Sequence, residues 1–170
     1  GLMEYTKKDG IHFTLFSPER KTIISGKLPL KKLPEKYKLI KIDGVYNISG
    51  DFVIFLTSLH PENIMQAAFY RIIVDGTVGT LKSEEVIDEF PVFTIRDGYG
   101  VPFSDVDVPA FFVEKDPGSD YYAAIKYNST AAETKDRIQV SHYGPDHVLI
   151  NRSNYTTPTD KYKYTVPLSI

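Results

Sequence analysis

Short segments in which apolar and polar residues alternate recur along this chain. Residues 11–17 read IHFTLFS, and residues 21–28 read KTIISGKL after a Pro-Glu-Arg connection. Alternation with a period of two is typical of strands with one buried face, and a short polar connection between two such runs is typical of a hairpin. The pattern therefore predicts an antiparallel hairpin near the beginning of the chain.

Further segments are equally short and rich in β-branched or aromatic residues. They read YKLIKI, DFVIFLTSL, PVFTIR, AFFVEK, YYAAIKY, RIQVSHY, HVLINRS and KYKYTVPLSI. Turn signals separate them at Asp43-Gly44, Asp75-Gly76, Asp97-Gly98, Pro117-Gly118 and Gly144-Pro145. About ten short strands at this spacing predict a mainly β fold, a single antiparallel β-sandwich or barrel domain that spans residues 1–170.

Two segments permit a helical interpretation. Residues 62–74 have apolar residues at four-residue spacing, but the run FYRIIV and the Asp75-Gly76 signal favour a strand in a hairpin. SEEVIDEFP favours one short helix near residues 83–90. Ser83 would cap it, acidic residues would occupy its positive first turn, and Pro91 would end it.

Composition limits the classes of chemistry. The chain has 170 residues and no cysteine, which excludes a disulfide framework, a cysteine zinc site and a thiol nucleophile. No run reaches the roughly 18 apolar residues of a membrane span, and the first residues lack the apolar core of a signal peptide. We therefore expect no membrane span, and any signal peptide would already have been removed.

Glycan acceptor patterns are frequent. The chain has five asparagines, and all but Asn63 begin an Asn-x-Ser/Thr pattern; the four are Asn47, Asn128, Asn151 and Asn154. This excess predicts N-linked glycans and an extracellular, secreted protein. The alternatives are that Asn, Ser and Thr coincide because all three favour turns, and that Met3 is the native start of an intracellular protein.

Two of these patterns overlap in NRSNYTT, residues 151–157. A branched glycan cannot be buried, and Pro158 with its Thr and Asp neighbours is typical of a loop. We expect an exposed loop there.

Charge is distributed unevenly. Residues 1–42 carry ten Lys and Arg against four Asp and Glu, whereas residues 43–120 carry four against fourteen. The basic stretch KLPLKKLPEKYKLIK permits three interpretations: a polyanion site, a sheet edge protected by lysines, or head-to-tail self-association with the acidic middle of another copy or a related subunit. Nucleic acid is the weakest option, because the whole chain has a net charge of −2 and no binding motif.

Catalytic candidates are few. Only SHYGPDH, residues 141–147, combines histidines with a serine and an acid, and it makes His142 the candidate for a hydrolase. Carboxylates paired for glycoside hydrolysis are the other hydrolytic option. The sequence contains no G-x-S-x-G, no H-E-x-x-H, no phosphate loop and no dinucleotide fingerprint.

Acidic loops suggest a possible cofactor. Asp105 and Asp107 share one face of an extended segment, and Asp116 and Asp120 flank the Pro117-Gly118 turn. Oxygen ligands of this kind suit calcium, but the order does not match an EF-hand loop. Solvated turn acids are the alternative interpretation.

Aromatic residues are abundant, with twelve Tyr and ten Phe. Several form doublets, and in a strand the two members of a doublet point to opposite faces. The candidates for an apolar small-molecule site or an assembly surface are Phe69, Phe111, Phe112, Tyr121 and Tyr122. Core packing between covered faces explains the same residues.

Three functions follow. The first is a secreted, N-glycosylated, non-enzymatic subunit of an oligomer, with a storage, structural or apolar-ligand-carrying role. The second is a carbohydrate-binding or adhesion module in which exposed tyrosine stacks on sugar. The third is a hydrolase that uses His142 or paired carboxylates. An aromatic-lined cavity, an exposed tyrosine or a catalytic cleft would distinguish them.

Overall fold

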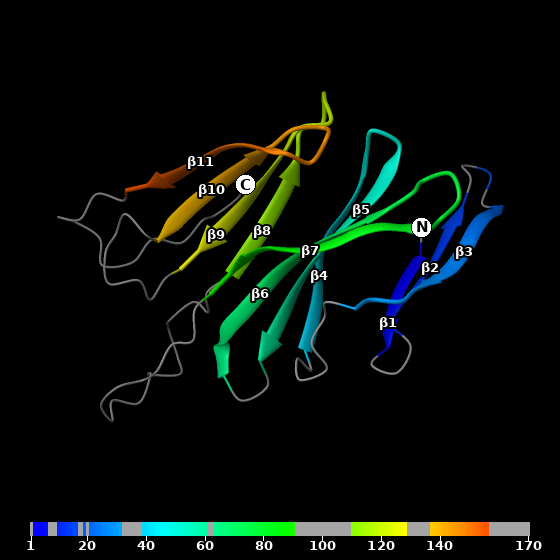
Figure 1. The fold of residues 1–170 in the computed structure, drawn as a ribbon, viewed down its shortest axis with the longest axis horizontal. Coiled ribbons are helices and arrows are strands. Elements are labelled where there is room, and N and C mark those ends of the chain that lie inside the picture. Colours follow the sequence, from blue (N-terminus) through cyan, green and yellow to red (C-terminus); the bar gives the residue numbers. More distant parts are fainter. Residues whose placement is uncertain are drawn as a thin grey trace.

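The computed structural model describes residues 2–6, 10–16, 19, 21–31, 39–60, 63–90, 110–128 and 137–156. These residues form eleven strands and no helix. Every pairing is antiparallel, and the strands form three open sheets that lie as three layers (Figure 1). The predicted mainly β, antiparallel fold is confirmed as a sandwich of layers and not a closed barrel.

Each sheet is a meander in which every strand pairs with the next one along the chain. Sheet A contains β1 (Leu2–Thr6), β2 (Gly10–Phe16) and β3 (Thr22–Leu28). Sheet B contains β4 (Leu39–Ile48), β5 (Asp51–His60), β6 (Asn63–Val74) and β7 (Leu81–Glu89). Sheet C contains β8 (Ala110–Lys115), β9 (Tyr122–Tyr127), β10 (Ile138–Tyr143) and β11 (Leu149–Tyr155). Sheets B and C thus repeat the same four-stranded unit.

Sheet B is the middle layer, and its two central strands are buried on both faces. Residues 53–58 of β5 and 67–74 of β6 are all buried. Odd-numbered residues such as Phe55 and Phe69 pack against sheet C, and even-numbered residues such as Leu56 and Ile72 pack against sheet A. A strand covered on both faces requires a nearly continuous apolar run, which is what DFVIFLTSL provides.

The predicted hairpins at residues 11–28 and around Asp75-Gly76 are confirmed. So are the turns at Pro117-Gly118 and Gly144-Pro145, which join β8 to β9 and β10 to β11. Ser49 and Gly50 join β4 to β5 with positive φ angles of 51° and 86°, as a type I′ turn requires.

The predicted short helix near residues 83–90 is wrong, because this segment is β7. The hairpin places it beside β6, where ladder pairing and burial of its neighbour Phe90 outweigh its local helix signals. Its acidic residues serve as cross-strand and cross-sheet partners instead: Glu85 pairs with Arg71 and Asp88 with Lys126. The described part of the chain contains no helix with the length and apolar character of a membrane crossing.

The predicted turn at Asp43-Gly44 is also wrong. These residues lie inside β4, where the register with β5 shifts between Ile42 and Gly44 as at a β-bulge. Asp43 accepts a hydrogen bond from the hydroxyl of Thr57 at 2.6 Å. The Asp97-Gly98 turn and the strands expected in PVFTIR and KYKYTVPLSI lie outside the described residues.

The strand expected in HVLINRS is confirmed as part of β11. The exposed loop expected at residues 151–157 is wrong for residues 151–155, although these residues are exposed as expected. Its residues 151–155 belong to β11, at one edge of sheet C, and all seven residues of this strand are exposed. Only β10 packs beside it among the described strands, so its side chains on both faces reach solvent.

Candidate functional site

Four turns lie at the same end of sheets B and C: β4–β5, β6–β7, β8–β9 and β10–β11 (Figure 1). We call this the turn end. The Ser49 amide donates to Oδ2 of Asp120 at 3.0 Å, which links the first and third turns. A Cβ on Gly76 would lie 1.8 Å from the carbonyl oxygen of Gly50, so the first two turns touch and only glycine fits between them.

Lys82 reinforces this contact. Its Nζ lies 2.7 Å from Oδ1 of Asp51 and 3.3 Å from Oδ2 of Asp75. The amides of Thr77 and Val78 also donate to Asp75, and together with Lys82 they hold the pKa of this carboxyl below its usual value. The β4–β5 and β6–β7 turns are therefore held together by backbone contact and by ion pairs.

The two described calcium candidates take part in turn chemistry. Asp116 accepts hydrogen bonds from the Ser119 hydroxyl and the Gly118 amide, and these lower its pKa. Asp120 accepts from Ser49, which lowers its pKa, and it lies 3.4 Å from Lys115. No group of three or more His, Cys, Asp or Glu that would suit a metal occurs among the described residues. The other candidates, Asp105 and Asp107, lie outside them.

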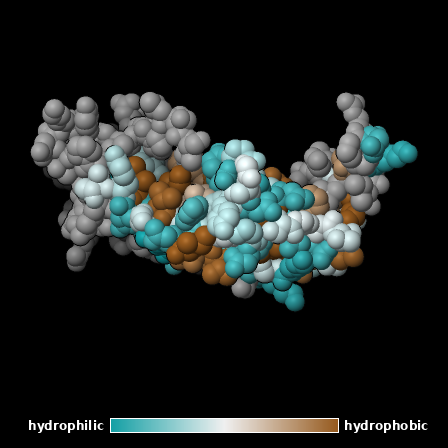
Figure 2. Space-filling model, turned by 90° about the horizontal axis from the view of Figure 1, so that it is seen from above, coloured by the Kyte–Doolittle hydropathy of each residue, from teal (hydrophilic) through white to brown (hydrophobic). Residues whose placement is uncertain are grey.

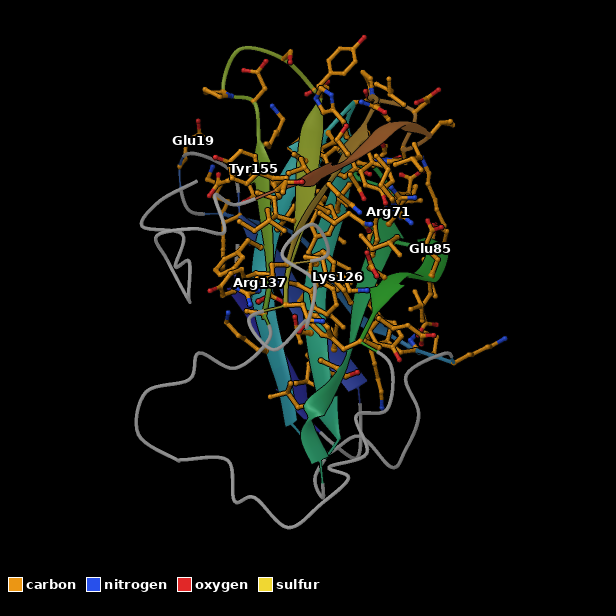
Figure 3. The ribbon with its side chains drawn as sticks, turned by 90° about the vertical axis from the view of Figure 1, so that its left-hand side faces the viewer. Glu19, Arg71, Glu85, Lys126, Arg137 and Tyr155 are labelled. Atoms are coloured by element: carbon orange, nitrogen blue, oxygen red, sulfur yellow. The ribbon has the colours of Figure 1, made fainter. Side chains whose placement is uncertain are left out.

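A buried cation lies between sheets B and C. Arg71 of β6 stands directly opposite Glu85 of β7, and its Nε and Nη2 donate to Oε1 of Glu85 at 3.0 and 2.7 Å (Figure 3). Its Nη1 donates to the hydroxyl of Tyr122, and its guanidinium lies 5.0 Å from the ring of Tyr143. Hydrogen bonds and aromatic rings together offset the cost of burying this charge.

Tyr122 connects Arg71 to the β10–β11 turn. Its hydroxyl lies 3.3 Å from Nδ1 of His147, and its ring stacks on Tyr143 with centroids 5.1 Å apart. Burial raises the pKa of Tyr122 to about 12, although Arg71 opposes this shift. Burial and then Arg71 lower the pKa of His147, whose φ of 66° is left-handed. The contacts from Arg71 through Tyr122 to His147 therefore connect the β10–β11 turn to the interface between sheets B and C.

Tyr121, next to Tyr122, has different surroundings. It is 44% exposed, and its ring centroid lies 6.2 Å from that of His142. It borders a hollow of about 450 Å³ that is lined by Glu114, Asp116 and His142 among others. It also borders a second hollow, of about 530 Å³, on the side of the β10–β11 turn. We call Tyr121 and these two hollows the Tyr121 ridge.

The second hollow is apolar on one side. Val148, Leu149 and Ile150 follow one another and are 60%, 43% and 56% exposed. Figure 2 looks down on this end and shows hydrophobic patches between hydrophilic ones on the side where sheet C lies. Val148 ends the β10–β11 turn, and Leu149 and Ile150 begin β11. Three consecutive exposed apolar residues indicate a contact surface.

The structure separates the residues of the predicted hydrolase. Ser141 and His142 are adjacent in β10 and therefore point to opposite faces of sheet C. The Ser141 hydroxyl accepts from Nε of Arg152 at 3.0 Å, whereas His142 lies beside Tyr121. His147 is directed to Tyr122 instead. The geometry that a serine hydrolase needs is not formed by Ser141 and His142.

Three of the five aromatic candidates pack in the core between sheets B and C. Phe69 stacks on Phe111 with centroids 4.9 Å apart, and Phe55 lies 5.4 Å from Tyr122. Phe112 is half-buried on the opposite face of sheet C. Only Tyr121 of the five is exposed, so the five candidates do not form one site.

The four sequon asparagines have different surroundings. Asn47, Asn151 and Asn154 are exposed, and Asn128 is half-buried just after β9. Asn151 and Asn154 lie on opposite faces of β11 because they are three residues apart in a strand. Asn151 donates to the hydroxyl of Ser153 at 3.2 Å, and Asn154 accepts from Gln139 at 2.9 Å.

The sequence analysis did not identify Arg71 or His147 as residues that contact each other's partner, the hydroxyl of Tyr122. A single arginine in the apolar run FYRIIV was the available signal, because a charge in a strand that is covered on both faces requires buried partners.

No protein-family model, curated protein or solved structure matches this chain.

Proposed function

We propose that this protein is a secreted, N-glycosylated, non-enzymatic binding module that recognises neutral carbohydrate at the Tyr121 ridge. The half-exposed ring of Tyr121 beside the 450 Å³ hollow is the observation that carries the proposal. This volume falls within the range of about 300–1,000 Å³ typical of small-ligand sites. The ring stands on sheet C next to the firmly held Tyr122, so it is already placed for contact.

The residues around Tyr121 suit a sugar ring. The apolar face of a sugar packs against an aromatic ring, and its hydroxyl groups bond to polar side chains at the edge. Glu114, Asp116 and His142 line the hollow next to that ring. Lys115 also lines the hollow, but its Nζ lies 3.4 Å from Asp120 and donates to the carbonyl of Asp116. The carboxylates of Glu114 and Asp116 accept hydrogen bonds from neutral hydroxyls and repel sulfate or carboxylate groups, so the ridge favours neutral over acidic glycans.

Sequon exposure supports the secreted part of the proposal. Asn47, Asn151 and Asn154 all lie where an attached glycan would meet solvent. A glycan at Asn47 or Asn154 would leave the Tyr121 hollow open, because neither residue lines it. Glycans at these two positions are therefore compatible with ligand binding. Asn151 stands opposite His142, which lines the hollow, so a glycan there would lie on the same face as the ligand.

Binding to immobilised neutral and sulfated oligosaccharides tests the recognition site. Tyr121→Ala should weaken binding to a neutral glycan about tenfold, from the lost ring contact. Tyr155→Ala is the matched control, because Tyr155 is also exposed on sheet C but does not line the hollow. Equal binding by both variants, or a preference for sulfated glycans, would contradict the proposal.

Intact mass tests the secreted part. Protein from a glycosylating cell should exceed 19.3 kDa and lose the excess on N-glycan removal. An unmodified mass from its natural source would show that the sequons serve turn and strand chemistry only.

A second candidate is the subunit of an oligomer with a structural, storage or apolar-ligand-carrying role. The exposed run Val148, Leu149 and Ile150 favours it. A carrier site within the core gains no support, because Phe69, Phe111 and Tyr122 pack in direct ring contacts.

A further inference from the structure

β11 is an edge strand with an unusual composition. It ends sheet C in the order β11-β10-β9-β8, and no described strand pairs with its outer side. Leu149, Ile150 and Tyr155 are 43%, 56% and 57% exposed. Its register with β10 shifts between Leu149 and Asn151, as at a β-bulge, but residues 151–155 pair regularly with β10. Such a regular edge offers its outer backbone amides and carbonyls to another strand.

The edge strand β7 of sheet B shows how such pairing is usually prevented. β7 ends sheet B and carries charged residues along its length, namely Lys82, Glu84, Glu85, Asp88 and Glu89. Charges of this kind blunt an edge. β11 has Arg152 as its one charged residue, and that side chain is held by Ser141 at 3.0 Å. Over residues 151–155, β11 therefore lacks the row of charges that β7 has.

The sequons provide a different protection on the same strand. Asn151 and Asn154 project from opposite faces of β11, and both are exposed. A glycan on each would place a bulky, hydrated group above and below the edge. An incoming strand would meet one of them on either face.

We propose that β11 pairs antiparallel with β11 of a second copy, and that N-glycans at Asn151 and Asn154 keep this edge closed. The second part rests on the proposed glycosylation, and the first does not. Pairing about a twofold axis is self-complementary, since each copy offers the same edge. It joins two sheets C into one continuous antiparallel sheet.

Charge selects the position of the axis. Partners across an antiparallel pair share a face, so an axis at Arg152 would bring the two Arg152 side chains together. An axis at Ser153 places Arg152 opposite Asn154 of the second copy, a side chain that accepts hydrogen bonds. We therefore place Ser153 on the axis, opposite its own copy.

Protein made in bacteria, which carries no N-glycans, tests the pairing. Sedimentation should show a concentration-dependent dimer, and Ser153→Lys, which would place two lysines opposite each other on the axis, should raise its dissociation constant at least about tenfold. Val78→Lys is the matched control, because Val78 is 62% exposed but lies in the β6–β7 turn. A monomer at all concentrations, or equal dissociation constants for the two lysine variants, would overturn the pairing.

The absence of cysteine makes the axis testable as well. Ser153→Cys in the bacterial protein should form an intermolecular disulfide on mild oxidation, and Val78→Cys should not. A dimer in which the cysteines at position 153 remain free would overturn the axis at Ser153.

Expression in a glycosylating cell tests the role of the glycans. The native chain should be monomeric, Asn151→Gln/Asn154→Gln should dimerise, and Asn47→Gln should remain monomeric as the control. A monomeric double variant in cells whose bacterial counterpart dimerises would overturn glycan control. Missing glycans on the native chain would contradict the proposed secretion and leave the bacterial result as the test of the edge.

Discussion

The two interfaces of sheet B differ in polarity. The interface with sheet A is formed by apolar side chains such as Ile11, Leu28 and Leu56. Its buried carboxylate Glu84 lies at the margin and accepts from the Lys31 amide at 2.8 Å. The interface with sheet C adds to its apolar centre the buried Arg71 and its partners.

The apolar interface with sheet A only stabilises the fold, whereas the more polar interface with sheet C leads to the candidate site. Apolar burial stabilises both interfaces, but it positions no exposed group. The polar contacts of the sheet C interface end at the β10–β11 turn and at Tyr122, whose neighbour Tyr121 is the exposed ring. The half of the molecule that contains sheet C therefore carries both proposed surfaces, the Tyr121 ridge and the β11 edge.

Substitution of two neighbouring core residues of β5, one at each interface of sheet B, should give the largest changes in the free energy of unfolding. Phe55 faces sheet C and Leu56 faces sheet A, and both are fully buried. Phe55→Ala should lower the free energy of unfolding by about 4 kcal/mol and Leu56→Ala by about 3 kcal/mol. Urea unfolding measures both. A loss under about 1 kcal/mol for Leu56→Ala would mean that sheet A contributes little to the scaffold.

Arg71 gives the next largest effect. Arg71→Met leaves the buried hydroxyl of Tyr122 without its guanidinium donor and should lower the free energy of unfolding by about 2 kcal/mol. Tyr122→Phe should cost about 1 kcal/mol. Since the two groups contact each other, the double variant should lose less than the sum of the single variants. Strict additivity in urea unfolding would contradict the proposed link between Arg71 and the turn.

The smallest effect is a pH dependence confined to the sheet C interface. The pKa of His147 lies below its ordinary value of 6.5, because of burial and of Arg71, with Asp51, Glu85 and Asp146 opposing. The unfolded chain therefore binds this proton more tightly, and stability should fall as the pH drops below about 6.5. The carboxyls with lowered pKa, such as Asp116, have an ordinary value of 3.8 and act only at lower pH.

His147→Asn should flatten this slope in unfolding measurements between neutral and mildly acid pH, since asparagine also adopts the left-handed backbone at this position. His142→Asn, on the exposed face, is the control. A slope that persists in the His147 variant and disappears in the control would reverse the assignment.

Alternation identified most of the strands, because it depends only on neighbouring residues. The segment after Asp75-Gly76 shows the limit: Ser83 and the acids that follow favour a helix locally, yet pairing with β6 makes them a strand. The layer order depends on contacts between distant segments. DFVIFLTSL indicates a strand buried on both faces but not which sheets cover it.

The candidate site was predictable only in part. The doublet Tyr121-Tyr122 requires one ring to face outward, but the sequence does not indicate which one. Arg71, Tyr122 and His147 come from three places in the chain, and their contact arises only when sheets B and C pack. Asn151 and Asn154 were predicted to be exposed, and HVLINRS was predicted as a strand. Neither pattern indicated that this strand includes Asn154 or lies at the edge of a sheet.

Hydrogen exchange on the protein with a bound neutral oligosaccharide would show which half of the molecule recognises the ligand. Amide exchange should slow at residues 114–123 and 142–150, which contain the Tyr121 ridge, and should not change in β2 and β3 of sheet A. Protection located in sheet A, with none at Tyr121, would contradict the assignment of recognition to sheet C.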